Sequence, residues 1–217
     1  MRRFAFLLAF ALLSLTAFAT DGYFNNRAGT TMRWIIRDGQ GKVFGYCDET
    51  LVSMEGDLQN AKIEYAYGFL DPQRKSVTDG KLFEFKVAIK EGKTIAYVNN
   101  ISLGQLSGEY MPAGDLSSIP PGIRVGDKVP DSNLTVKVLT VFTAHNVYQD
   151  RRVVSRERVS VPAGAFDCFL VEDYETFTGS DNVKVQTWVA RGQGIIRQVV
   201  YKADGSVNQI FELTNIY

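Results

Sequence analysis

Apolar and polar residues alternate over long stretches of this chain, and this alternation limits its fold more than any other feature. A period of two residues is typical of a β-strand that buries one face. Aromatic and β-branched residues, which favour strands, occupy many of the apolar positions. The clearest stretch covers residues 62–69, with an apolar set at alternate positions: Ile63, Tyr65, Tyr67 and Phe69. A second such stretch, at 83–90, begins with Phe83 and Phe85.

Short turn signals separate these stretches, as in Asp38-Gly39-Gln40-Gly41 and Ala203-Asp204-Gly205-Ser206. Strands that short turns connect run antiparallel. The pattern predicts about ten strands and no strong amphipathic helix. The predicted fold is therefore all-β, an antiparallel meander that forms a barrel or a strongly curved half-barrel. Residues 20–217 are expected to form a single domain of this kind.

Residues 99–132 interrupt the pattern, because glycine and proline recur throughout them. So many breaking residues disfavour a long strand or helix. A connection of this length is uncommon in a compact domain unless it has a function of its own. We therefore expect one long irregular crossover or lid at 99–132.

The first nineteen residues have the three parts of a secretory signal. Arg2 and Arg3 precede an uncharged apolar run at 4–18, and Ala17-Phe18-Ala19 supplies small residues where a signal peptidase cuts. The run is short for a transmembrane span, which makes a retained anchor helix the weaker alternative. We expect residues 1–19 to be cleaved, leaving a soluble protein that does not span the membrane, in the periplasm or outside the cell.

The charge pattern argues against nucleic acid as a partner, since 24 basic residues balance 24 acidic ones without a basic stripe. The densest basic stretch, at 151–158, is interpreted as a solvated strand face. Glu172, Asp173 and Glu175 form an acidic cluster, which alternation splits between two faces. Solvated strand charges are the favoured interpretation of this cluster as well.

Familiar catalytic patterns are missing from the sequence. His145 is the only histidine, which leaves little basis for nucleophilic catalysis or a zinc site. Neither a C-x-x-C pair nor a phosphate-binding glycine loop occurs. We expect no enzymatic activity, no cofactor and no metal site.

The chain has two cysteines, Cys47 and Cys168. In an exported protein two cysteines can form a disulfide. They can equally remain free as buried, small hydrophobic side chains. The sequence leaves both alternatives open.

Several motifs in the chain resemble those of a known family. They include Val161-Pro162-Ala163-Gly164, the stretch from Trp188 to Arg197, Ile119-Pro120-Pro121-Gly122, and the opening Gly22-Tyr23-Phe24. Together they resemble the TapB or DUF3108-like family of exported bacterial proteins, of the Bacteroidetes type, whose function is uncharacterised. The resemblance implies an antiparallel β-barrel or strongly curved sheet in the periplasm or outside the cell. It assigns no site residue.

Two functional hypotheses follow from the predicted fold. The first is non-catalytic binding of a small apolar or amphipathic ligand, such as a lipid, inside the curved sheet. Barrels either enclose a ligand or fill their interior with their own side chains. Trp188 is more typical of core packing than of a ligand platform. The second hypothesis is a module of the cell envelope that binds a protein or glycan through an exposed sheet face or edge. The candidate ligand-binding residues are aromatic: Tyr65, Tyr67, Phe69, Phe83, Phe85 and Trp188.

Overall fold

The computed structural model describes residues 27–56, 60–90, 93–103, 106–115, 119, 122–138, 142–177 and 182–217. The predicted signal peptide at 1–19 lies outside these residues. Among the described residues, no helix has the length and apolar character needed to cross a membrane. The regular structure consists of the following strands: β1 (Thr31–Asp38), β2 (Val43–Gly56), β3 (Asn60–Leu70), β4 (Phe83–Lys90), β5 (Lys93–Leu103), β6 (Leu106–Asp115), β7 (Ser132–Val138), β8 (Phe142–Val161), β9 (Gly164–Phe177), β10 (Val183–Ala190), β11 (Gly194–Tyr201) and β12 (Val207–Ile216).

The twelve strands form one closed antiparallel barrel. Each strand pairs with its neighbours in the sequence, and β1 pairs with β12 to close the ring. At this seam Ile36 lies opposite Phe211 on one side and Gly45 on the other. The predicted all-β antiparallel meander is confirmed, and the described residues form twelve strands instead of about ten. Of the two predicted forms, a barrel and a strongly curved half-barrel, the structure shows the closed barrel.

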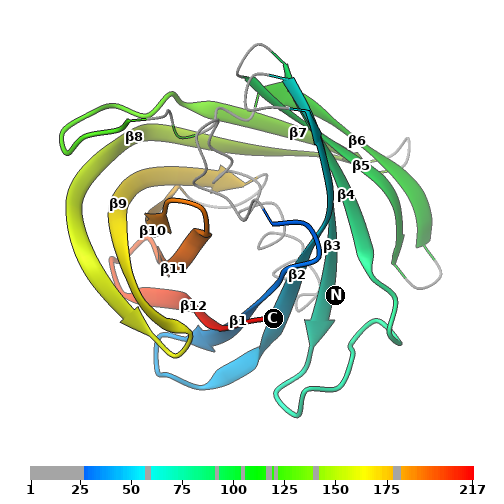
Figure 1. Ribbon diagram of the computed structural model, residues 1–217, viewed down its shortest axis with the longest axis horizontal. Helices are drawn as coiled ribbons and strands as arrows, with labels where there is room; N and C mark the ends of the chain where they lie inside the picture. The colour runs from blue at the N-terminus through cyan, green and yellow to red at the C-terminus, as the bar shows by residue number, and fades with distance from the viewer. Residues whose placement is uncertain are drawn as a thin grey trace.

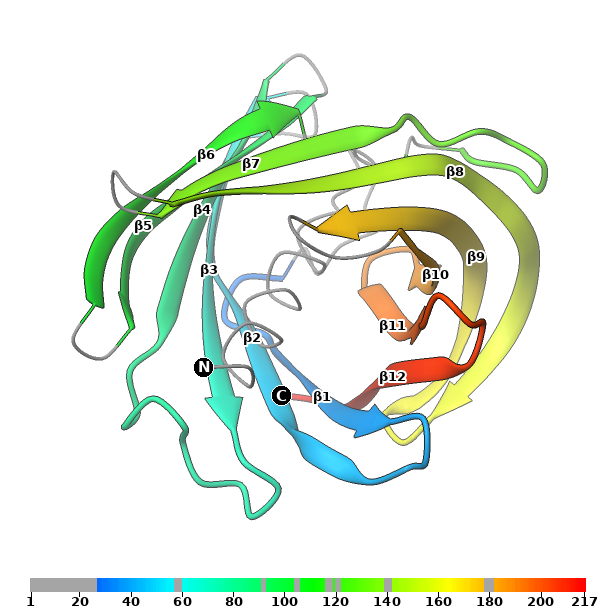
Figure 2. The same cartoon turned by 180° about the vertical axis from the view of Figure 1, so that it is seen from behind.

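The barrel is uneven in cross-section. β8 and β9 are long and bend around one side, while β2 to β6 line the other (Figure 1). The view from behind shows the same bend in β8 and β9 (Figure 2). Two register shifts in β8, between Gln149 and Arg152 and between Val153 and Ser155, accompany this bend. Such bulges increase the local twist of a strand, which allows a sheet to curve.

The prediction of an irregular segment at 99–132 is wrong for its first half. β5 continues to Leu103 and β6 spans Leu106–Asp115, so strands occupy most of 99–115. Pro112 lies within β6, opposite Val136. Glycine and proline weaken an isolated strand, but β6 has a partner on each side, and this pairing outweighs the local preference.

The second half of that segment is irregular, as predicted, and it packs against the barrel. We call its described residues, 119 and 122–131, the β6–β7 segment. Val129 donates its backbone N–H to the Arg151 carbonyl at 2.9 Å, and Val153 donates to the Asp127 carbonyl at 2.9 Å. Ile119 and Ile123 are buried. The segment therefore lies along β8 and inserts apolar side chains between it and the neighbouring strands.

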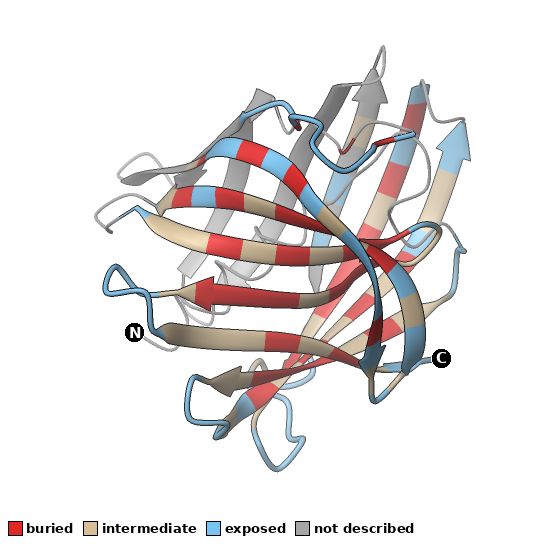
Figure 3. Cartoon of the chain, turned by 90° about the vertical axis from the view of Figure 1, so that its left-hand side faces the viewer, coloured by how far each residue is buried: buried red, intermediate tan, exposed pale blue. Residues whose placement is uncertain are grey.

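Buried residues alternate with exposed ones along the strands (Figure 3). The buried positions form two core clusters. The first cluster is centred on β1, β2, β3 and β12 and includes Trp34, Tyr65 and Phe211. The second joins the β6–β7 segment to β8 through β11 and includes Ile123, Val171 and Ile195.

Cys47 and Cys168 are both free thiols, and both are buried in the first core cluster. The disulfide that the sequence left open is not formed. Burial raises the pKa of Cys168 to about 12 and that of Cys47 well above its ordinary value. The two residues therefore pack as small hydrophobic side chains, the other alternative.

Candidate functional site

Tyr65, Tyr67 and Phe69 form a buried aromatic row on β3. Their exposed fractions are 1%, 0% and 3%, and all three belong to the first core cluster. The rings of Tyr65 and Tyr67 lie 6.3 Å apart between centroids, with an interplanar angle of 40°. Glu64 and Lys86, which alternate with the row and its β4 neighbours, form a 2.8 Å ion pair on the outside. The aromatic row therefore faces the inside of the barrel.

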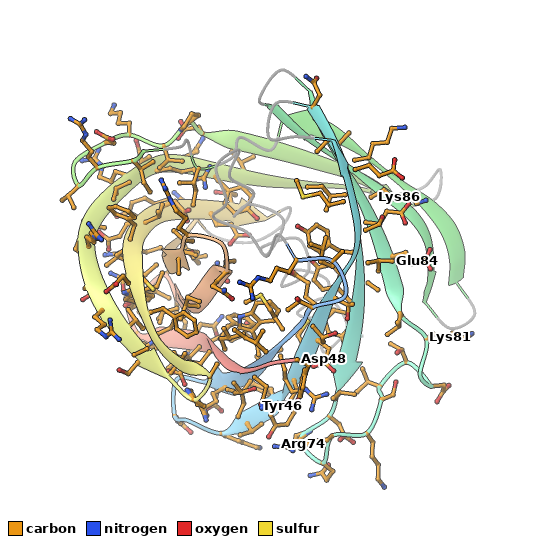
Figure 4. All side chains as sticks on the ribbon, viewed as in Figure 1. Tyr46, Asp48, Arg74, Lys81, Glu84 and Lys86 are labelled. Atoms are coloured by element: carbon orange, nitrogen blue, oxygen red, sulfur yellow. The ribbon has the colours of Figure 1, made fainter. Side chains whose placement is uncertain are left out.

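Phe83 and Phe85 continue this row on the neighbouring strand as far as the backbone shows. Phe83 is paired with Tyr67 and Phe85 with Tyr65 across the β3–β4 ladder. Their side chains lie outside the described part of the structure. Figure 4 shows the intervening Glu84 and Lys86 on the outer side of β4. The register thus brings five of the six predicted aromatic positions together, three on β3 and two on β4.

Trp188 does not join the aromatic row. It alternates along β10 with Thr187 and Val189, which are buried, and it is itself only half-buried. Its indole N–H donates to Oε1 of Glu157 at 2.6 Å, and the Arg197 guanidinium lies 5.2 Å from the ring centroid. It packs against the first core cluster. The expectation that Trp188 is chiefly a packing residue agrees with these contacts.

Glu49 is a buried carboxyl group beside the aromatic row, and sequence reasoning missed it. It lies on β2 directly opposite Tyr67 and is 7% exposed. The Tyr67 hydroxyl donates to Oε2 of Glu49 at 2.6 Å. Burial raises the pKa of Glu49 to about 7, although the hydrogen bond from Tyr67 acts in the opposite direction. Glu49 is two residues from Cys47 and two from Leu51, so all three side chains lie on the same face of β2. This spacing was the signal in the sequence that Glu49 faces inward.

A second group of buried polar side chains lies between β8 and β9. Tyr148, Arg151, Asp173 and Glu175 are all buried. Nε of Arg151 lies 3.6 Å from Oδ2 of Asp173, and the Arg151 guanidinium donates to the Pro130 carbonyl at 3.0 Å. The Tyr148 hydroxyl is hydrogen-bonded to Glu175. Burial raises the pKa of Asp173 to about 6, against the influence of Arg151. We call these four residues the polar cluster.

The interpretation of these charges as solvated strand faces is wrong for Arg151, Asp173 and Glu175. The predicted alternation in β9 is correct, since Glu172 is half-buried and faces Lys184 and Gln186. Asp173 and Glu175, on the other face of β9, point to the interior. Arg151 faces inward because β8 has a bulge at this point, where Asp150 has a φ of 54°. A bulge shifts the alternation by one residue, which a sequence pattern does not reveal.

Two polar side chains, Thr187 and Gln198, lie on the inner face between the two core clusters. Directly opposite residues on paired strands share a face. Thr187 lies opposite Val171 and Gln198, and Gln198 lies opposite Phe211. Val171 belongs to the second core cluster and Phe211 to the first. Gln198 is 1% exposed, and its side-chain amide donates to the Thr187 hydroxyl at 3.0 Å.

Charged side chains form pairs on the outer surface. Arg33 pairs with Asp48 through two hydrogen bonds of 2.6 Å, and Arg74 lies 5.2 Å over the ring of Tyr46 (Figure 4). Large apolar side chains are nevertheless exposed at Phe44, Val52 and Leu82. Within the described residues, no three histidine, cysteine or acidic side chains are grouped as a metal site would require.

Comparison with known proteins links the chain to a family and to two solved structures. A family model for DUF3108-like proteins matches residues 27–213. A predicted exported protein of Bacteroides fragilis with a YmcC-like fold superposes with a TM-score of 0.70 at 19% identity, covering 91% of this chain and 99% of that one. A predicted lipoprotein of Parabacteroides distasonis gives a TM-score of 0.68 at 13% identity, with the same coverage. At these identities the likeness is one of fold. No curated protein matches the chain significantly.

Proposed function

The chain belongs to the DUF3108-like family, and on that premise we propose that it is an exported, non-catalytic protein that binds a small apolar or amphipathic molecule inside its barrel. The observation that carries this proposal is a closed ring of twelve strands with an aromatic row on its inner face. The diameter of a barrel grows roughly linearly with its strand number. About eight strands already enclose a packed core or one small ligand, so twelve strands enclose more.

The inner face offers the contacts that an amphipathic molecule needs. Tyr65, Tyr67 and Phe69 supply a continuous aromatic surface. Glu49 and the polar cluster supply a few fixed polar groups within an apolar lining. Small-molecule sites in proteins typically have this composition, mostly apolar with a small number of placed polar groups.

Export is supported by two independent observations. The N-terminal sequence has the charge, the apolar run and the small residues of a secretory signal. The two solved structures of similar fold are a predicted exported protein and a predicted lipoprotein. We therefore propose the cell envelope or the cell exterior as the site of action.

A second candidate function is a binding module for another envelope protein or a glycan. Phe44 and Val52 favour it, because both are about half exposed on the outer face of β2. On that outer face, however, Tyr46, Asp48 and Thr50 lie between Phe44 and Val52. The two exposed apolar side chains are therefore not adjacent. The closed ring also offers no free strand edge among the described strands. The ligand-binding proposal is therefore the better supported.

Native mass spectrometry of the mature protein, purified gently from its own envelope, tests the proposal. We expect a bound mass that leaves on denaturation and that extracts into organic solvent. Calorimetric titration with dodecanol provides a second measurement on ligand-free protein. Tyr65→Ala should weaken dodecanol binding, whereas Tyr174→Ala, which removes an exposed tyrosine of β9, should not. An apo mass together with no dodecanol binding overturns the proposal in favour of the interaction module.

A further inference from the structure

The polar cluster contains more negative than positive charge. Arg151 is the cation that acts most strongly on Asp173. The negative charge of Asp131 acts on both residues and raises the pKa of each. Glu175 adds a third carboxyl group, on the same face of β9 as Asp173. Arg151 also donates to the Pro130 carbonyl, so its guanidinium is shared between two acceptors. Arg151 is therefore a cation beside three carboxyl groups, of which Asp173 and Asp131 act on its guanidinium directly.

Two buried oxygen atoms near this cluster accept no hydrogen bond within the described chain. They are Oδ1 of Asp173 and Oε1 of Gln198. Asp173 is 5% exposed and Gln198 is 1% exposed. Leaving a buried acceptor without a donor is unfavourable, and such groups in native proteins usually have a partner. Both missing partners are hydrogen-bond donors.

The two residues lie on one face of the sheet, on strands that flank β10. Asp173 is opposite Val185, and Gln198 is opposite Thr187, two residues further along β10. Gln198 is also opposite Phe211 in the first core cluster, which contains the aromatic row. A molecule on this face would thus meet acceptors at one end and an apolar lining at the other.

We propose that this part of the inner face binds the protonated amine of a long-chain amphipathic molecule, with Asp173 as the charge partner and Gln198 as a second acceptor. The proposal rests on the ligand-binding function proposed above and names the chemistry of the head group. An alkylammonium supplies both the positive charge and the N–H donors that the cluster lacks. A carboxylate supplies neither and meets three carboxyl groups. An alcohol supplies one donor and no charge.

Three probes of equal chain length separate these cases: dodecylamine, dodecanol and dodecanoate. Each is titrated calorimetrically into the mature, ligand-free protein at about pH 7.5, where the amine is charged. The amine and the carboxylate are kept below their micelle concentrations and dodecanol below its solubility limit. We expect dodecylamine to bind at least about tenfold more tightly than the other two. Asp173→Asn should abolish this preference while changing dodecanol binding less than about twofold. The matched control is Glu172→Gln, which removes a neighbouring carboxylate from the opposite face of β9.

A pH series gives a second readout that does not depend on the folding of Asp173→Asn. It is measured in the Glu49→Gln background, so that titration of Glu49 makes no contribution. The groups around Asp173 are Tyr148 and Arg151 from β8, Asp131 from the β6–β7 segment, and Glu175 from β9. Glu172, on the opposite face of β9, also raises the pKa of Asp173 through its charge. As Asp173 loses its proton, the preference for dodecylamine over dodecanol should increase.

The outcomes distinguish this inference from the proposed function. A preference for the amine that Asp173→Asn removes, or that increases with pH, supports the inference. Equal binding of all three probes, or tighter binding of dodecanoate, overturns the inference and leaves the proposed function intact. Failure of all three probes to bind overturns the inference, and together with an apo mass it overturns the proposed function as well.

Discussion

The Tyr67 hydroxyl donates a 2.6 Å hydrogen bond to the Glu49 carboxyl group, and both side chains are buried in the barrel. This pair is placed by direct cross-strand register between β2 and β3. A carboxyl group with one tyrosine donor in an apolar lining resists ionisation, because burial disfavours the charged form. The stability of the barrel should therefore depend on pH through Glu49.

Glu49→Gln tests that dependence. The pKa of Glu49 rises from an ordinary 4.5 to about 7 on folding. The folded state therefore binds more protons between these values, and stability falls as pH rises through this range, by about 3 kcal/mol at most. Glu49→Gln removes that loss, so the variant should be more stable than wild type at pH 8 and similar at pH 4.5. Urea unfolding at both pH values measures the difference; a variant equally destabilised at both would contradict it.

Tyr67→Phe removes the donor and leaves the carboxyl group in place. The loss should be about 1–3 kcal/mol at pH 8, where Glu49 is ionised and most needs the hydrogen bond. It should shrink at pH 4.5, where Glu49 is protonated. Combining Tyr67→Phe with Glu49→Gln in a double-mutant cycle isolates the interaction. A pH-independent loss would show that Tyr67 contributes packing alone.

Arg151→Met and Arg152→Met form a matched pair, because the bulge in β8 buries Arg151 and leaves Arg152 exposed. Removing Arg151 leaves Asp173 buried without its nearest cation and should cost about 3–5 kcal/mol at pH 8. The cost should decline as pH falls and Asp173 is protonated. Removing Arg152 should cost about 0.5 kcal/mol or less. Equal effects from the two substitutions would mean that Arg151 faces solvent.

Gly39→Ala tests the seam between β1 and β12. A Cβ atom on Gly39 would lie 2.1 Å from the Val207 carbonyl oxygen, at the start of β12. The backbone must move to relieve this overlap, so we expect a loss of about 1–3 kcal/mol or more. Gly68→Ala is the control, because its Cβ would meet the end of the exposed Leu82 side chain at 3.2 Å and Cβ of Asp48 at 3.8 Å, an ordinary contact distance. If Gly39→Ala is as stable as the control, the ring does not close in this register.

The two thiols provide a further test. Cys47 and Cys168 are buried and free, and burial raises the pKa of both. Iodoacetamide reacts with thiolate, so it should label neither residue in the folded protein and both after denaturation. An intact mass lower than the reduced sequence by two hydrogens would instead show that the pair is oxidised.

The sequence alone determined most of the strands, the direction of their pairing and the inward face of β3. Tyr65, Tyr67 and Phe69 recur at every second position, and a period of two residues has one structural meaning in a sheet. The buried carboxyl groups were not predicted, since an acidic residue on a strand is usually solvated. Glu49 stands at the same alternate positions as Cys47 and Leu51, which indicates an inward face, but the usual solvation of acidic residues argued against its burial.

Tertiary structure decided what the alternation leaves open. The barrel closes because β1 pairs with β12. These two strands are separated by most of the chain, so no local sequence pattern encodes their contact. The bulge at Asp150 changes which of two adjacent arginines is buried, because one extra residue reverses the alternation that follows it. β6 likewise remains a strand at Pro112 because it pairs with β5 on one side and β7 on the other, although the local sequence predicted an irregular segment. These features depend on neighbours distant in sequence, so only the folded chain reveals them.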